Sequence, residues 1–227
     1  MAEERTFGSQ RGQGPVTGLF ERPAEPFALY VMAHGAGAGM RHRFLQGMAE
    51  ALAAAGVATL RFDFPYTTKR QRRPDPQPVL EATVRSACAE ARALAPDLPL
   101  FAGGKSMGGR MSSNAAAREP LPALRGLVFL GFPLHPRKTA ATGRADHLRA
   151  LTLPLLFLQG TRDELAEIGL MRELAASLGP RATLREVEGA DHSFALRKSA
   201  GKSEAQVHGE LAGAIAGWMR PLSSPSR

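Results

Sequence analysis

Apolar residues follow one another along this chain in two alternating patterns, one typical of buried strands and one typical of amphipathic helices. Residues 27–33 and 57–62 are almost continuously apolar, as strands covered on both faces are. Between them, Phe44, Met48 and Leu52 recur at helical spacing. Further strands are predicted at residues 98–102, 125–130, 153–159 and 183–187, and further helices at residues 79–95, 107–118, 164–178 and from residue 203 onward. This alternation predicts an α/β protein with a mostly parallel central sheet and helices on both faces.

Residues 15–220 are predicted to form one domain, because no linker or internal repeat interrupts the alternation. The polar, glycine-rich residues 1–14 and the tail 221–227 are predicted to be flexible. Ser203 and Gln206 match the S-x-x-Q capping box that opens a helix. The segment between the strands that end at Leu130 and begin at Leu153 is too short for a substantial lid domain, so we expect an open site.

Ser106 is the first candidate for chemistry, because it stands in a G-x-S-x-G segment (GKSMG, 104–108) between a predicted strand and a predicted helix. A nucleophile in that context occupies a sharp, strained turn, where only very small residues fit two positions before and after it. The turn lifts the hydroxyl above the edge of the sheet. It also aims the backbone N–H of Met107 at the same point, so we expect Met107 to be one oxyanion donor.

A serine hydroxyl needs a base to remove its proton and a carboxylate to orient that base. Asp163 directly follows the strand predicted at 153–159, and His192 follows the strand predicted at 183–187. Both therefore lie at the carboxyl edge of the sheet, where the turn at Ser106 also opens. Asp191 is a weaker candidate for the acid because it is adjacent to the base, and Glu164 is a weaker substitute for Asp163.

A second backbone donor for the oxyanion should come from the glycine-rich turn that follows the strand at 27–33. Ala36 is the preferred donor in that turn, and Gly37 is the next choice. The turn also needs its glycines for backbone reasons alone, so this role adds to a structural one. His34 precedes the turn, and we expect it to order the loop rather than to transfer protons.

Together these segments resemble the α/β-hydrolase superfamily: HGAG (34–37), GKSMG (104–108), Asp163 and the pair Asp191-His192. More narrowly, RFDFPY (61–66), GGKSMGG (103–109) and QGTRD (159–163) resemble a small, lidless branch akin to dienelactone hydrolases, with many uncharacterised bacterial members. The resemblance covers roughly residues 28–218. It implies the α/β-hydrolase fold, a Ser-Asp-His triad and hydrolysis of an ester-like bond. True dienelactone hydrolases carry a cysteine nucleophile, so Ser106 argues against a dienelactone substrate.

The chain carries a formal net charge of +8, and its basic residues supply one further candidate for substrate binding. The densest basic run follows the strand at 57–62, at the same edge as Ser106, and comprises Lys69, Arg70, Arg72 and Arg73. No aromatic residues interleave with this run, which argues against nucleic-acid binding. The run could bind or attract an anionic small-molecule substrate. The alternative is a solvated loop that serves only solubility.

Other candidate motifs and catalytic residues are excluded by their position or spacing in the sequence. GKS (104–106) is not a P-loop, because Pro99 stands where the motif needs glycine, and the turn at 35–37 lacks the third dinucleotide glycine, with Met40 in its place. Cys88 lies on the apolar face of a helix and is predicted to be a buried hydrophobe. The remaining histidines lack a strand-end position with a partner carboxylate and are expected to be surface or satisfied polar residues: His42, His135, His147 and His208.

The sequence thus predicts a serine hydrolase that cleaves a carboxylic ester or thioester through an acyl-enzyme, with neither metal nor organic cofactor. The competing interpretation is a non-catalytic α/β-hydrolase-like protein that binds a ligand or a protein. With no signal-peptide pattern, no apolar run of the roughly 18 residues that a membrane span needs, and a single cysteine, we expect a cytoplasmic protein.

Overall fold

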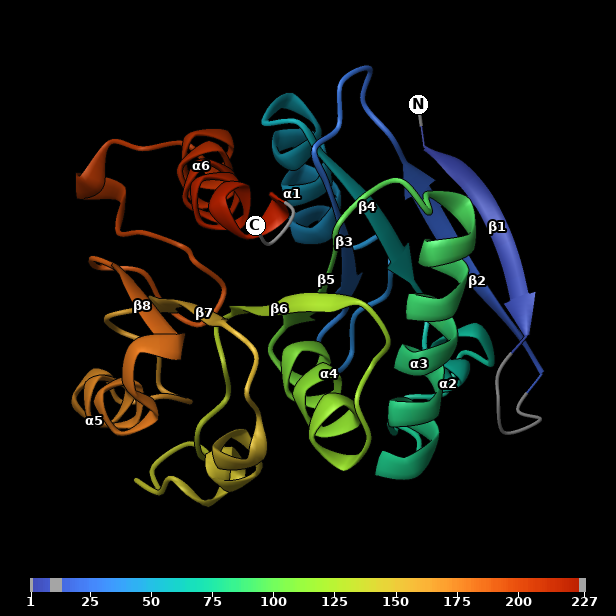
Figure 1. The fold of residues 1–227 in the computed structure, drawn as a ribbon. Coiled ribbons are helices and arrows are strands. Elements are labelled where there is room, and N and C mark those ends of the chain that lie inside the picture. Colours follow the sequence, from blue (N-terminus) through green and yellow to red (C-terminus); the bar gives the residue numbers. More distant parts are fainter. Residues whose placement is uncertain (1, 9–13, 225–227) are drawn as a thin grey trace.

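The computed structural model of the protein describes residues 2–8 and 14–224 (Figure 1). An eight-stranded sheet has the order β1-β2-β4-β3-β5-β6-β7-β8. Its strands are β1 (Glu3–Gly8), β2 (Pro15–Glu21), β3 (Ala28–Ala33), β4 (Val57–Phe62), β5 (Leu100–Lys105), β6 (Leu124–Leu130), β7 (Leu155–Gly160) and β8 (Ala182–Val187). The α-helices are α1 (Arg43–Ala54), α2 (Pro65–Thr68), α3 (Gln77–Leu94), α4 (Met107–Arg118), α5 (Ile168–Leu178) and α6 (Glu204–Ser223). Short 3₁₀ helices lie at η1 (Gly143–Ala150), η2 (Gly179–Arg181) and η3 (Lys198–Ala200).

Strands β3 to β8 run parallel to one another, which confirms the predicted α/β architecture. Side chains of β3 alternate between the two faces: Val31 packs in one apolar cluster and Tyr30 in the other. Helices α1 and α6 cover one face, and α3, α4 and α5 cover the other (Figure 1). Because both faces are covered, the central strands read as continuous apolar runs.

The prediction that residues 1–14 are flexible is wrong for the segment Glu3–Gly8, which forms β1 and pairs antiparallel with β2. Phe7 lies opposite Val16 and is buried, so a single apolar side chain anchors this edge strand. The residues around Phe7 are charged, polar or glycine, so the sequence shows no apolar pattern that would predict this strand. Residues 9–13 lie outside the described part of the chain.

The carboxyl-terminal boundary also differs from the prediction. Helix α6 extends to Ser223 and contains Pro221, so the predicted flexible tail is wrong for residues 221–223, while 225–227 lie outside the described residues. The start of α6 is as predicted: the Ser203 hydroxyl accepts from Gln206 N, and the Gln206 side chain accepts from Ser203 N. Pro221 has no backbone N–H to donate to the carbonyl of Gly217, and α6 ends two residues beyond it.

The predicted absence of a lid is confirmed. The connection between β6 and β7 contains η1, which packs against α4, and no inserted domain. Among the described residues, no helix combines the length and the apolar character needed to cross a bilayer. The carboxyl ends of the parallel strands therefore open onto short loops, and these loops carry the candidate site.

Candidate active site

Ser106 lies in a strained turn between β5 and α4, with φ 52° and ψ −118°. The left-handed φ of a non-glycine residue is costly and is typical of a nucleophile turn. A Cβ at Gly104 would lie 2.1 Å from the carbonyl oxygen of Ala33, and a Cβ at Gly108 would lie 2.4 Å from it. The backbone at the end of β3 thus excludes any side chain two positions before or after Ser106, as the sequence predicted.

The structure brings the predicted nucleophile, base and acid together from three separate loops. His192 Nε2 lies 2.9 Å from Ser106 Oγ, and His192 Nδ1 lies 2.7 Å from Asp163 Oδ2. These contacts fit the tautomer in which Nδ1–H donates to the carboxylate and the serine hydroxyl donates to Nε2. The arrangement can transfer the serine proton to the imidazole and stabilise the cation that results.

Asp163 is held in place by several donors, although its side chain is fully buried. Oδ1 accepts from Leu165 N at 2.8 Å, and Oδ2 accepts from Gln159 Nε2 at 2.5 Å. Gln159 is itself buried, and its carbonyl oxygen accepts from Phe132 N at 2.9 Å. Sequence reasoning missed Gln159 as a positioning residue. The signal was its polar side chain at the end of an apolar strand.

The alternative acids serve other purposes. Asp191 Oδ1 accepts from Ser193 N at 2.8 Å and from Ala195 N at 3.0 Å, so this carboxylate closes the loop that carries the base. Glu164 is exposed and pairs with Arg137 at 3.3 Å. Neither carboxylate is the one bonded to His192 Nδ1.

The predicted oxyanion donors lie next to Ser106. Met107 is the first residue of α4, and the first N–H groups of a helix have no partner within it. Ala36 follows Gly35, where an added Cβ would lie 3.5 Å from Ser106 Cβ, so this turn borders the nucleophile. The turn is closed by Ala38 N, which donates to the Gly35 carbonyl at 3.2 Å. The assignment of Ala36 and Met107 as donors remains a prediction.

His34 orders this turn, as expected. Its buried ring bonds the Gly35 carbonyl through Nδ1 at 2.8 Å, and Nε2 accepts from Phe64 N at 3.2 Å. Burial lowers the pKa of His34 and favours the neutral ring that these contacts require. The ring therefore ties the turn after β3 to the segment before α2.

Lys105, the residue before the nucleophile, was missed by the sequence analysis. Its ammonium donates to the carbonyl oxygen of His192 at 2.6 Å and lies 6.0 Å and 5.7 Å from the ring centroids of Phe44 and Phe194. Burial lowers its pKa to about 8, and the nearby carboxylates of Asp163 and Asp191 oppose that shift. A charged residue at the end of a buried strand was the available signal.

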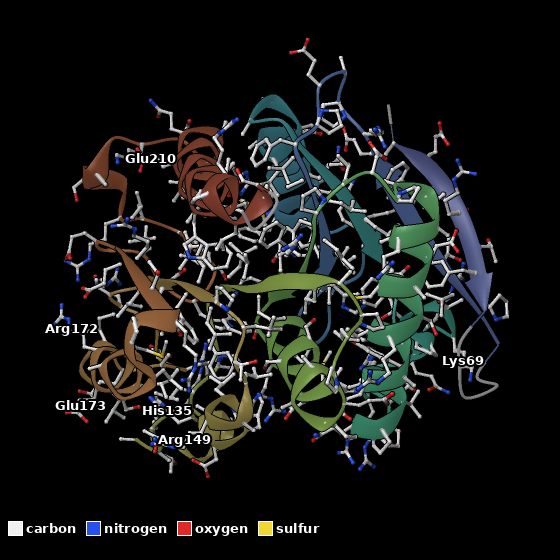
Figure 2. All side chains as sticks on the ribbon, viewed as in Figure 1. Lys69, His135, Arg149, Arg172, Glu173 and Glu210 are labelled. Atoms are coloured by element: carbon white, nitrogen blue, oxygen red, sulfur yellow. The ribbon has the colours of Figure 1, made fainter. Side chains whose placement is uncertain are left out.

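The basic run of the sequence lies apart from these contacts. All four of its candidates are exposed, and no described contact joins them to the triad: Lys69, Arg70, Arg72 and Arg73. Figure 2 shows Lys69 beside α2, projecting from the surface. The start of the loop is fixed, because Tyr66 N donates to Asp75 Oδ2 at 2.8 Å and Thr67 Oγ1 lies 3.2 Å from His34 Nε2. The role of the run in substrate binding remains a prediction.

The other polar candidates are satisfied structural residues. Cys88 is buried, and burial raises its pKa to about 12. His42 caps α1 through Phe44 N, and His135 accepts from Glu167 N at 2.9 Å. Among the described residues, no group of three or more potential ligands could hold a metal ion.

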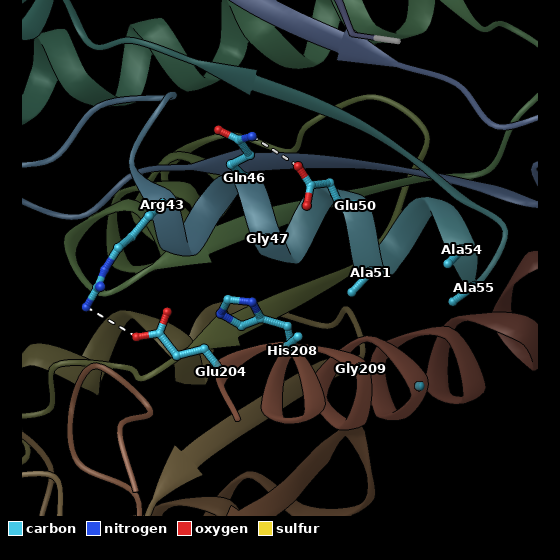
Figure 3. Close-up of a pocket in the computed structure, with 12 residues that line it drawn as sticks. Arg43, Gln46, Gly47, Glu50, Ala51, Ala54, Ala55, Glu204, His208 and Gly209 are labelled. Atoms are coloured by element: carbon cyan, nitrogen blue, oxygen red, sulfur yellow. Dashed lines mark hydrogen bonds and ion pairs between the residues drawn. The ribbon is translucent and has the colours of Figure 1, made fainter. Parts of the chain in front are cut away.

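A large surface hollow lies away from the triad. A groove of about 860 Å³ runs between α1 and α6, and none of Ser106, Asp163 or His192 lines it. Figure 3 shows Arg43 paired with Glu204 across one end of the groove. We assign the candidate site to the triad because its chemistry, and not the size of the hollow, identifies it.

Solved structures with the same fold cover nearly the whole chain. A lidless α/β serine hydrolase from Xanthomonas campestris is 20% identical, with a TM-score of 0.74, and the match covers 100% of this chain and 97% of that one. Dienelactone hydrolase from Anabaena variabilis is 21% identical, with a TM-score of 0.74 and coverage of 97% and 98%. A carboxyl esterase from Bacillus coagulans is 14% identical, with a TM-score of 0.77 and coverage of 98% and 99%. These likenesses show the fold.

Curated relatives are similar in sequence over most of the chain. Two Mycobacterium tuberculosis proteins, both named "Putative phosphoribosyl transferase", are 30% identical over 190 residues, which cover 81% of this chain and 40% of theirs. The chain thus spans about two-fifths of the length of these relatives. A family model described as an alpha/beta hydrolase domain matches residues 26–220, from just before β3 into the last turn of α6. The chain therefore belongs to the alpha/beta hydrolase domain family.

Proposed function

We propose that this protein is a serine hydrolase that cleaves a carboxylic ester or thioester of a small molecule through an acyl-enzyme. The observation that carries the proposal is the continuous hydrogen-bonded chain from Ser106 Oγ through the His192 ring to the buried Asp163 carboxylate, built on a strained turn. Membership of the hydrolase family and the fold of the lidless serine hydrolase support it.

In the first half of the reaction, Ser106 Oγ attacks the carbonyl carbon while His192 Nε2 accepts its proton. The oxyanion is stabilised by the N–H groups of Met107 and Ala36. The tetrahedral intermediate then expels the alcohol or thiol, which takes the proton from His192. Asp163 holds the ring and stabilises its charged form throughout.

In the second half, water enters the site and attacks the acyl-enzyme. His192 accepts a proton from that water and returns it to Ser106 Oγ as the acid leaves. The cycle consumes one water and yields an acid and an alcohol or thiol. The chain's own residues perform every proton transfer in this scheme.

A fluorophosphonate probe, which phosphonylates activated serines, tests the proposal directly. The wild-type protein should be labelled at Ser106, and the Ser106→Ala variant should not be labelled. On a panel of chromogenic esters that differ in chain length and charge, Ser106→Ala should lose about 10⁶-fold in turnover. A purified, folded Ser106→Ala variant with a tenth of wild-type activity would contradict the assignment.

The competing function is a non-catalytic module that binds a ligand or a protein. An unlabelled wild-type protein that hydrolyses none of the panel would favour that alternative. The curated relatives are named for a phosphoribosyl transferase activity, but this chain spans about two-fifths of their length. Its contacts support a nucleophile, a base and an acid instead.

A further inference from the structure

Two arginines on packed elements lie close enough for their charges to interact, and neither has an acidic partner in a described ion pair. Arg110 stands one turn into α4, and Arg144 stands in η1, which packs against α4. The pKa of Arg110 is lowered by its burial and by the positive charge of Arg144. Arg110 Nε is buried and has no hydrogen-bond partner within the described part of the chain. Neither side chain forms a described ion pair.

Two carboxylates lie nearby, on Glu81 and Asp146, and no described ion pair joins either to Arg110 or Arg144; Asp146 is exposed on η1. Glu81, on α3, pairs with Arg118 Nε at 2.7 Å and accepts from Gln77 Nε2 at 2.7 Å. The positive charge of Arg144 acts on Arg110, and a partly buried charge without a partner costs free energy that a bound anion can recover. A bound anion would therefore stabilise this arrangement.

Arg110 lies close to the nucleophile Ser106 along α4. Arg110 N donates to the carbonyl oxygen of Ser106 at 3.2 Å, as the first turn of α4 requires. Four residues of helix rise about 6 Å, and helical side chains tilt toward the amino terminus, which here is the end that carries Ser106. The amino-terminal end of the helix dipole also favours an anion. Arg110 thus lies one helical turn from the nucleophile, on an element whose side chains tilt toward it.

We propose that Arg110 and Arg144 form a subsite that binds a carboxylate carried by the substrate, and that they select carboxylate-bearing esters over neutral ones. The proposal rests on the serine hydrolase function proposed above and adds the class of substrate. Guanidinium groups suit this task, because they bind carboxylates through paired N–H donors.

The neighbouring His147 provides a reporter that does not depend on catalysis. Its Nε2 lies 2.7 Å from Ser113 Oγ, and its pKa is lowered to about 4, first by burial and then by the charge of Arg110, while the carboxylates of Glu81 and Asp146 oppose the shift. An anion that neutralises Arg110 should raise the pKa of His147. NMR titration of the histidine rings in Ser106→Ala, with and without glutarate, would measure this shift.

Kinetics test selectivity with matched ester pairs. The first pair is 4-nitrophenyl hydrogen glutarate and its neutral methyl ester, which places the carboxylate on the acyl side. The second pair is 4-acetoxybenzoate and its methyl ester, which places it on the leaving group. In wild type we expect kcat/KM for the charged member of at least one pair to exceed that of the neutral member by about tenfold, the worth of one charge-assisted hydrogen bond.

In Arg110→Gln and Arg144→Gln, the ratio of charged to neutral kcat/KM should fall toward one, and Arg110→Lys should retain part of it. Arg149→Gln is the matched control, since Arg149 is exposed on the same 3₁₀ helix (Figure 2) and should keep the wild-type ratio. Circular dichroism and thermal unfolding establish that each variant is folded.

The outcomes separate this proposal from the one on which it rests. If wild type hydrolyses neutral esters, shows no preference in either pair, and glutarate leaves the His147 pKa unchanged, the subsite is wrong and the hydrolase stands. If no ester is hydrolysed and Ser106 is not labelled, the hydrolase is wrong. The glutarate titration of Ser106→Ala then still decides whether the anion site exists.

Discussion

The ammonium of Lys105 donates a hydrogen bond to the backbone carbonyl of His192 over 2.6 Å, so the residue before the nucleophile holds the loop that carries the base. Nucleophile and base are thereby connected twice, once through their side chains and once through this neighbouring pair. The ammonium lies beside the stacked rings of Phe44 and Phe194, and burial in these surroundings lowers its pKa to about 8.

This environment predicts a pH-dependent stability. The pKa of Lys105 is about 8 in the folded protein against an ordinary 10.5, so between these values the unfolded chain binds more protons. The free energy of unfolding should therefore rise with pH across the window from 8 to 10.5. Below pH 8 both states are protonated, and the burial of the charge costs its full amount, up to about 3 kcal/mol.

Lys105→Met removes this ionisable group. The difference in unfolding free energy, wild type minus variant, should grow by up to about 3 kcal/mol between pH 7.5 and pH 10.5. Urea denaturation of both proteins at several pH values measures the difference and cancels titrations that they share. A difference that stays flat, or that shrinks as pH rises, would show that the ammonium is not buried as described.

A strand could be predicted from the sequence where most of its residues are buried, and a site residue where a strand end fixes its position. Apolar runs covered on both faces predicted β3 to β7, because burial acts on every residue of such strands. Strand β1 contributes only Phe7 to the core, so its pattern carried no such signal. Within the site, Ser106, Asp163 and His192 could be placed because strand ends fix them on one edge.

Lys105 and Gln159 could not be placed in the same way, because their roles depend on side chains reaching other loops. Lys105 bonds a carbonyl on the loop after β8, and Gln159 bridges the acid to the backbone after β6. No local pattern specifies such contacts, which arise only when the strands lie side by side. The pairing of Arg110 with Arg144 belongs to the same class.

The identity of the acid can be tested by exchanging carboxylates for amides. Asp163→Asn keeps the shape of the side chain but loses the charge that orients His192, so we expect kcat to fall by about 10⁴-fold. Asp191→Asn and Glu164→Gln are matched controls and should lose far less. Steady-state kinetics on one neutral chromogenic ester compares all three. Greater damage from Asp191→Asn would show that the acid is misassigned.

The strained turn predicts opposite effects for two glycine-to-alanine changes. In Gly108→Ala the new Cβ would lie 2.4 Å from the Ala33 carbonyl oxygen, a backbone atom that cannot move freely. We expect a loss of about 1–3 kcal/mol in the free energy of unfolding, as for other overpacked sites, together with a loss of fluorophosphonate labelling.

Gly213→Ala on α6 is the control, because its Cβ would meet nothing within 4 Å and the residue is helical. Alanine should stabilise that helix by about 0.5–1 kcal/mol and leave labelling unchanged. Urea denaturation gives both stabilities. Equal behaviour of the two variants would remove the physical basis for the nucleophile turn.

The exposed basic run predicts a dependence on salt that the Arg110–Arg144 pair does not share. Its charges act through solvent, where screening sets in over about 10 Å at 0.1 M salt. If the run steers anionic substrates, the preference for 4-nitrophenyl hydrogen glutarate over its methyl ester should shrink as sodium chloride rises from 20 mM to 500 mM. Changing all four basic residues to Gln should remove this salt-sensitive part and leave the neutral ester nearly unaffected: Lys69, Arg70, Arg72 and Arg73. A wild type that shows no preference at low salt, or a quadruple variant with the wild-type salt dependence, would leave the run as a solvated loop.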